Sequence, residues 1–213
     1  MAEGVVGGFP LFPLGIVALP GEAVPLHIFE DRYKRMIERC LEGEPGTLDR
    51  AFGVIWLSDE ELKGVGCACE VERVLERLDD GRLNILARGS VPFRLLTRQD
   101  DLPYPAGVVE LLDESEEEPD GTSAEAARRL YSDLVRQATD REIDPEELRE
   151  MGAYGMAGTV EFAPEAKQEL LELRSENARM ALLARLLESA IDRLALLERA
   201  QERARSNGKV RFV

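Results

Sequence analysis

Apolar residues take every second place from Leu83 to Leu95 in this 213-residue chain, and mostly polar residues lie between them. Such alternation gives a β-strand one apolar face. A similar alternation begins at Val65 and slips near Arg73, which predicts a second strand over residues 64–78 with a β-bulge. Asp80-Gly81 lies between the two runs and predicts the tight turn of a long hairpin.

Four further apolar runs predict the rest of a sheet, at residues 9–14, 23–29, 51–57 and 104–112. Pro10 and Pro13 lack the N–H that a strand donates, so we expect the first of these strands at a sheet edge or beside a bulge. Five or six strands joined by short turns predict a partly closed antiparallel β-barrel.

One helix is predicted within this strand-rich part, from residue 31 to about residue 41. Its apolar side chains have the spacing of a single buried face and are Tyr33, Met36, Ile37, Cys40 and Leu41. Gly43 follows as a natural stop. The N-terminal part is therefore expected to be a barrel with one helix.

An acidic stretch, DESEEEPDG at residues 113–121, separates the strand pattern from a helical one. Thr122 with Glu125 predicts a capping box, and Asp144-Pro145 predicts a further helix start. Other helices are predicted from Pro164 and from residue 175 to about 206. We therefore expect an α+β protein with a barrel subdomain at 1–113, an acidic linker at 114–121, a helical bundle at 122–208 ending in a long helix, and a tail at 209–213.

Charge narrows the classes of function. The chain carries 42 acidic and 27 basic side chains, a formal net charge of −15, and neither half is basic. Nonspecific nucleic-acid binding depends on basic groups, so this composition disfavours it.

The three cysteines have no disulfide-framework spacing, which indicates a reducing compartment. Residues 4–20 follow Glu3 and are interrupted by prolines, so we expect no signal peptide or membrane span and a cytoplasmic location.

The residues with reactive side chains do not assemble into a predicted catalytic or metal site. Cys67 and Cys69 share one strand face with two valines, which is typical of small core side chains, and tetrahedral zinc needs four ligands. His27 is the single histidine, and we expect it to face solvent or to form a structural hydrogen bond. The acidic run at 116–118 is expected to be a solvated loop, because a hard cation needs converging oxygens.

Two further enzyme signatures are missing from the sequence. It contains no Gly-x4-Gly-Lys-Ser/Thr loop, so no nucleotide cofactor is expected. A serine–lysine pair would need a lysine in apolar surroundings. Lys34 and Lys167 are expected at exposed helix positions, Lys63 in a loop and Lys209 in the tail, so peptidase activity is not expected.

Five groups of residues, taken in order, carry a family resemblance. They are Phe9-Pro10-Leu11 with Leu14; Leu19-Pro20-Gly21 with residues 25–30 and Arg32-Tyr33; Phe52-Gly53-Val54; Val65-Gly66 with Asp80-Gly81-Arg82 and Gly89; and Ala166-Lys167-Gln168 with Leu171-Glu172 and Arg179. Together they resemble the N-terminal substrate-binding domain of the Lon (ATP-dependent protease La) family over most of residues 9–195. The family usually has an arginine where this chain has Pro92, so that arginine's role is not carried over.

The resemblance implies a pseudouridine-synthase-and-archaeosine-transglycosylase-like (PUA-like) barrel, a helical bundle and the binding of substrate polypeptides. The ATPase and Ser–Lys peptidase modules of the full protease have no counterpart here, so we expect a free-standing form. Noncatalytic binding of a polypeptide or partner protein is the predicted function, and a homodimer stays open. The alternatives are a peptidase, or RNA binding through the PUA-like barrel.

Large apolar side chains near barrel ends or edges are the candidate binding surface. They are Phe12, Phe29, Trp56 and Phe93. If several of them are exposed together, they would form an apolar patch for unfolded segments. No cofactor and no metal ligand are predicted.

Overall fold

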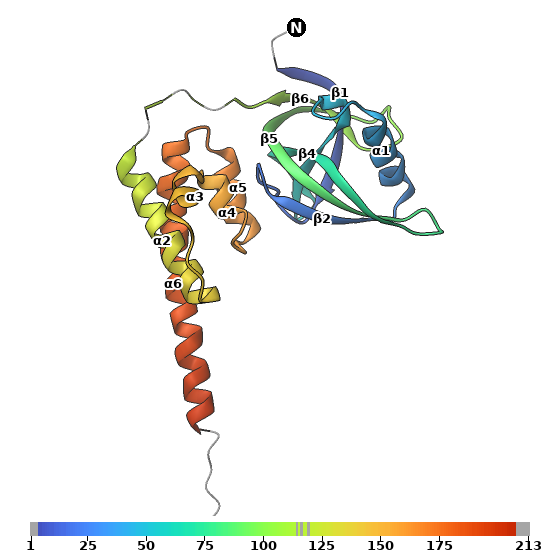
Figure 1. The fold of residues 1–213 in the computed structure, drawn as a ribbon. Coiled ribbons are helices and arrows are strands. Elements are labelled where there is room, and N and C mark those ends of the chain that lie inside the picture. The colour runs from blue at the N-terminus through green and yellow to red at the C-terminus, as the bar shows by residue number, and fades with distance from the viewer. Residues whose placement is uncertain (1–3, 114, 116, 119, 208–213) are drawn as a thin grey trace, which may run out of the picture. The chain divides into compact units, whose positions relative to one another are not determined.

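The structure is a computed structural model that describes residues 4–113, 115, 117, 118 and 120–207 (Figure 1). The chain forms two compact units. Unit 1 comprises Met1–Glu116 and Tyr154–Ser175, and unit 2 comprises Glu117–Ala153 and Glu176–Val213. The predicted boundaries at 113 and 122 stay a prediction, and the predicted tail at 209–213 lies outside the described residues. No helix in the described part combines the length and the apolar character that a membrane crossing requires.

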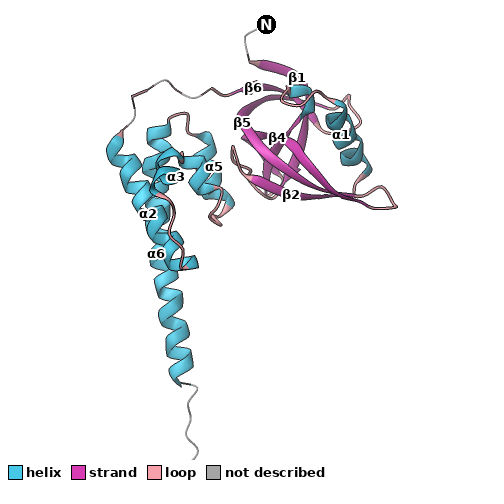
Figure 2. Cartoon of the chain, in the orientation of Figure 1, coloured by secondary structure: helices cyan, strands magenta, loops and turns pink. Residues whose placement is uncertain are grey.

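The six strands of the sheet all belong to unit 1 (Figure 2). They are β1 (Val5–Leu14), β2 (Ala23–Ile28), β3 (Ala51–Ser58), β4 (Glu61–Arg77), β5 (Leu83–Gln99) and β6 (Ala106–Leu111). Their order is β2-β5-β4-β3-β1-β6, and a further pairing of β5 with β6 closes five of them into a barrel. The predicted α+β class is confirmed.

One strand pair differs from the expected antiparallel barrel. β1 and β3 run parallel, with Leu11 opposite Gly53 and Leu14 opposite Trp56. The chain between them contains β2, the helix α1 (Asp31–Glu42) and the 3-10 turn η1 (Leu48–Arg50). This long crossover connection lets β3 enter the barrel in the same direction as β1.

β1 lies between two strands, but each of its prolines has a paired residue on one side only, Pro10 opposite Ala106 of β6 and Pro13 opposite Ile55 of β3. β1 pairs with β3 on one side and with β6 on the other. Its register with β6 shifts between Val6 and Phe9, so the predicted bulge is present next to Pro10. The register of β4 and β5 likewise shifts between Val71 and Arg73, which confirms the bulge that the sequence predicts there.

Phe93 of β5 fills the centre of the barrel. Its ring is fully buried and meets the ring of Phe9 edge-on, with centroids 5.5 Å apart. A Cβ atom at Gly53 or at Gly66 would lie 2.6 Å from this ring. These two glycines therefore make room for a phenylalanine in the core.

The residues of α1 pack as its periodicity predicts. Tyr33, Met36, Ile37 and Cys40 are buried, and charged residues occupy most of the other positions. Gly43 follows the helix, and a Cβ atom there would lie 2.6 Å from the backbone of Asp49. The glycine thus ends the helix and admits the close approach of the next segment.

Residues 154–175 join the barrel although they look helical in sequence. This segment contains most of α4 (Ala153–Ala157) and all of α5 (Pro164–Glu172). Nζ of Lys167 lies 2.5 Å from Oε1 of Glu22, and Nε2 of Gln168 donates to the carbonyl of Val65 at 3.1 Å. The expectation of exposed side chains for Lys167 and Lys34 is wrong, because the two are only 14% and 19% exposed.

Unit 2 contains α2 (Gly121–Thr139), α3 (Pro145–Glu150) and α6 (Glu176–Asn207). Asp120 caps α2 by accepting from the N–H of Thr122, so the cap lies two residues before the predicted one. Asp144 caps α3 as predicted. The side chain of Asn177 accepts from the N–H of Asp120, so α2 and α6 begin side by side.

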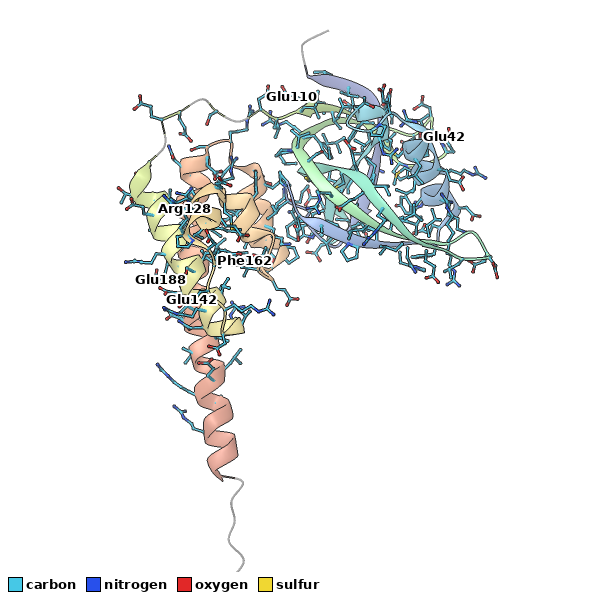
Figure 3. All side chains as sticks on the ribbon, in the orientation of Figure 1. Glu42, Glu110, Arg128, Glu142, Phe162 and Glu188 are labelled. Carbon is cyan, nitrogen blue, oxygen red and sulfur yellow. The ribbon has the colours of Figure 1, made fainter. Side chains whose placement is uncertain are left out.

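Unit 2 contains one buried arginine, Arg179, and one half-buried arginine, Arg128. Arg179 is 1% exposed, and its Nε lies 2.8 Å from Oε2 of Glu176. The other carboxylate oxygen of Glu176 accepts from the N–H of Ala153. Arg128, labelled on α2 in Figure 3, donates to the carbonyl of Met151 at 3.5 Å. These bonds join α6 and α2 to residues 151–153, the segment that follows α3.

Candidate functional site

A groove with a volume of about 520 Å³ lies on unit 1, beside the start of α1. Its walls come from the end of β1, the residues after β2, the first turn of α1, the β3–β4 turn and the end of β5. Its apolar lining includes Phe12, Leu14, Phe29, Tyr33, Leu57 and Leu62. The proline-rich opening of the chain thus forms a large part of the groove.

Phe29 is the most exposed aromatic side chain of the groove. It is 59% exposed, although it is large and apolar. Its ring stacks on the His27 ring, with centroids 5.9 Å apart and planes 23° apart. Nδ1 of His27 in turn lies 2.6 Å from Oδ1 of Asn84. Phe29 is therefore braced by a hydrogen-bonded neighbour while one face stays open to solvent.

The floor of the groove is formed by buried aromatic side chains. Phe12 is buried, and its ring centroid lies 4.3 Å from that of Tyr33. Burial raises the pKa of Tyr33, Arg32 opposes this shift, and Glu30 adds to it. Leu57, 39% exposed, adds a second open apolar side chain. Concave apolar surface with a few polar groups is typical of a binding site.

Five charged side chains line the groove, and two of them neutralise each other. Nη2 of Arg32 lies 2.7 Å from Oε2 of Glu30, and its guanidinium carbon lies 4.6 Å from the centre of the Tyr33 ring. Arg98 and Asp100 come from the end of β5, and Glu60 comes from the β3–β4 turn. Among the described residues, none of these last three has an ion-pair partner.

The turn that carries Glu60 has an uncommon backbone. Asp59 and Glu60 both have positive φ, 49° and 66°. Two successive residues of this kind are typical of a type I′ hairpin turn, which favours asparagine and glycine. The strands on either side pair through Leu57 with Leu62 and Ser58 with Glu61. The hairpin register therefore fixes the position of Glu60 at the groove.

The four predicted binding residues do not form one surface. Phe12 and Phe29 both line the groove. Trp56 is 8% exposed, with Nζ of Lys63 5.4 Å from the centre of its ring, and Phe93 lies in the barrel core. The structure adds Tyr33 and Leu57 to the site. Tyr33 lay on the predicted buried face of the helix, and Leu57 gave no signal beyond its place at a strand end.

The described residues contain no group of three or more His, Cys, Asp and Glu side chains placed to hold a metal ion. Cys67 and Cys69 are buried on β4, as expected for core side chains. Burial raises the pKa of Cys67, and it raises the pKa of Cys40 to about 11. The thiols of Cys67 and Cys40 therefore stay protonated near neutral pH.

Comparison with known proteins agrees with this barrel and helical arrangement. A crystal structure of a Lon N-terminal domain protein from Xanthomonas campestris is 23% identical and superposes with a TM-score of 0.64, covering 84% of this chain and 97% of that one. The N-terminal domain of a Mycobacterium avium complex Lon protease is 18% identical, with a TM-score of 0.61, over 85% of this chain and 98% of that one. These likenesses establish the fold.

Sequence comparison matches this chain to a part of two Lon proteases. An alignment 212 positions long with a Lon protease of Xanthomonas oryzae pv. oryzae has 27% identity and covers 92% of this chain and 25% of the relative. An alignment 204 positions long with a Lon protease of Paraburkholderia phytofirmans has 24% identity and covers 87% of this chain and 24% of the relative. The chain thus spans about a quarter of the length of these relatives.

The family model of the ATP-dependent protease La (LON) substrate-binding domain matches residues 8–189. The match runs from β1 into α6 and includes every residue that lines the groove. This chain belongs to the ATP-dependent protease La (LON) substrate-binding domain family.

Proposed function

We propose that this protein binds polypeptide segments in the groove of unit 1 without cleaving them. The family supports substrate recognition in general. The observation that carries the proposal is the exposure of Phe29, at 59%, on a concave apolar surface. Burying large apolar groups there would remove them from water, which is the main source of affinity for unfolded segments.

Direct binding measurements test this proposal. A short fluorescent peptide with a phenylalanine-rich centre is titrated with the protein, and its anisotropy is followed. We expect Phe29→Ser to weaken binding by about tenfold, the loss expected from roughly 1.4 kcal/mol of apolar contact. Leu96→Ser is the matched control, because Leu96 is 48% exposed on β5 and does not line the groove. Equal effects of the two substitutions would overturn the groove as the binding site.

The noncatalytic part of the proposal has its own readout. Mass spectrometry of the same peptide after prolonged incubation should show it intact. Cleavage that persists through purification would contradict this part and revive a peptidase. We also propose a cytoplasmic location, which the three buried, unpaired thiols support because such thiols are typical of a reducing compartment.

A further inference from the structure

We propose that the groove of unit 1 prefers apolar segments flanked by lysine or arginine, and that Glu60 and Asp100 set this preference. The inference rests on the proposed function and names the class of polypeptide that the same site would take. Its basis is the balance of charges around the apolar floor.

Only three of the five charges at the groove are available to a ligand. Arg32 and Glu30 are joined at 2.7 Å, and the guanidinium also lies over the Tyr33 ring. Their charges cancel to a first approximation. The remaining charged groups are the carboxylates of Glu60 and Asp100 and the guanidinium of Arg98, all on exposed residues.

Within the part of the chain that the structure describes, two unpaired carboxylates therefore oppose one unpaired guanidinium at the edge of the apolar surface. A ligand with cations beside its apolar side chains would place opposite charges next to Glu60 and Asp100. A ligand with acidic flanks would meet like charges there, and the net charge of −15 on the chain would add repulsion over a longer range. Complementarity of this kind selects partners more than it adds affinity.

The backbone supports the assignment of Glu60. Its φ of 66° and the φ of 49° at Asp59 place a carboxylate in a turn that glycine or asparagine would fill with less strain. Asp100 follows directly after β5, whose last residue, Gln99, is paired with Ala106 of β6 and accepts from the N–H of Gly8 through its side-chain Oε1 at 2.7 Å. Each carboxylate thus lies next to a paired strand residue, Ser58 and Glu61 on either side of the Asp59-Glu60 turn and Gln99 before Asp100.

Peptide binding with varied flanks tests the inference. Three short fluorescent peptides share one apolar centre and differ only in flanking lysine, serine or glutamate. At low salt we expect the lysine-flanked peptide to bind the full-length protein about tenfold more tightly than the glutamate-flanked one, because each exposed charge pair contributes about two- to fivefold. The ratio should shrink towards one as salt rises.

Substitutions at the groove distinguish the effect of its own charged side chains from the effect of the net charge of the whole chain. Glu60→Gln and Asp100→Asn should each reduce the lysine-to-glutamate affinity ratio by about two- to fivefold, whereas Arg98→Gln should increase it. Asp79→Asn is the control, since it removes an exposed carboxylate that lies in the β4–β5 connection and does not line the groove. The inference fails if Asp79→Asn changes the ratio as much as Glu60→Gln does.

The serine-flanked peptide keeps this inference distinct from the proposed function. If that peptide binds and Phe29→Ser weakens it, but the flanks make no difference, peptide binding in the groove stands and the charge preference is overturned. If none of the three peptides binds, the proposed function itself fails.

Discussion

The ammonium group of Lys167 lies 2.5 Å from Oε1 of Glu22, and each side chain is 14% exposed. The two residues are 145 positions apart in the chain. Oε2 of the same carboxylate accepts from the N–H of Leu19 at 3.0 Å. Glu22 thus joins α5 to the loop that precedes β2, and the helix is held to the barrel by an ion pair largely shielded from water.

Removing the cation of this pair should destabilise unit 1. We expect Lys167→Ala to lower the free energy of unfolding by about 2 kcal/mol, because Glu22 would keep a poorly solvated carboxylate without its partner. Trp56 is the one tryptophan of the chain and lies in the barrel, so its fluorescence during urea unfolding reports on unit 1.

Lys34→Ala is the matched control for that measurement. The side chain of Lys34 is 19% exposed, close to the value for Lys167, but its partner Asp31 is 86% exposed. Exposed pairs contribute little, so we expect a loss below about 1 kcal/mol. A loss for Lys167→Ala no larger than for Lys34→Ala would show that the pair with Glu22 adds no special stability.

Gly89 should not tolerate a side chain. A Cβ atom there would lie 2.1 Å from the carbonyl oxygen of Leu19, and this backbone is hydrogen-bonded to the strand through Gly21 and Glu22. We expect Gly89→Ala to cost about 3 kcal/mol or more, measured by urea unfolding, because the loop must move to relieve the overlap. Gly64→Ala is the control, since nothing lies within 4 Å of its added Cβ, and it should change stability by about 0.5 kcal/mol at most.

The buried thiol of Cys40 should make stability fall at alkaline pH. Burial raises its pKa from 9.0 to about 11, so between these values the folded chain keeps a proton that the unfolded chain has lost. Raising the pH through this window therefore favours unfolding, whereas the thiol's contribution is fully present below about pH 9. The loss from this group should reach about 2 kcal/mol near pH 11.

Urea unfolding of the wild type and Cys40→Ala across this pH range isolates the effect. The variant will be less stable at every pH because it lacks the buried sulfur, so the comparison uses the slope with pH and not the absolute value. A slope that is the same in both proteins would contradict the assignment to Cys40.

Local patterns in the sequence predict those parts of the fold that depend on neighbours along the chain. The alternation along β5 places Leu83, Ile85 and Phe93 in the core, and all three are buried. The spacing in α1 predicts its buried face for the same reason. The spacing of apolar residues along a strand or helix indicates which of its faces is buried, because the backbone geometry sets the direction of each side chain.

The sequence does not predict which helix or strand packs against, or pairs with, which other element. Helical periodicity in residues 164–172 indicates a buried face, but it does not tell whether helices or strands cover it. In the structure Gln168 donates to the carbonyl of Val65 in β4, so the strands take part in covering it. The parallel pairing of β1 with β3 is a similar choice, which no local pattern encodes.

In the candidate site, too, the sequence does not predict which apolar side chains are covered by other elements and which are exposed. Phe29 and Phe93 are both phenylalanines in or next to predicted strands, yet one is 59% exposed and the other is fully buried. The difference comes from Gly53 and Gly66, which are distant in sequence and leave space for the Phe93 ring. Phe29 follows the last residue of β2, where no partner strand covers it.

Because residues 154–175 pack with the barrel, cleavage of the chain between the barrel strands and this segment would not by itself separate the two fragments. The acidic stretch near residue 117 looks like a place where a protease would separate the protein into halves. The fragment after the cut would still carry Lys167 and Gln168 against Glu22 and Val65. It would also keep Arg174, whose Nε donates to the carbonyl of Asp113 at 2.7 Å. A protein nicked there would hold its two pieces together without a covalent link.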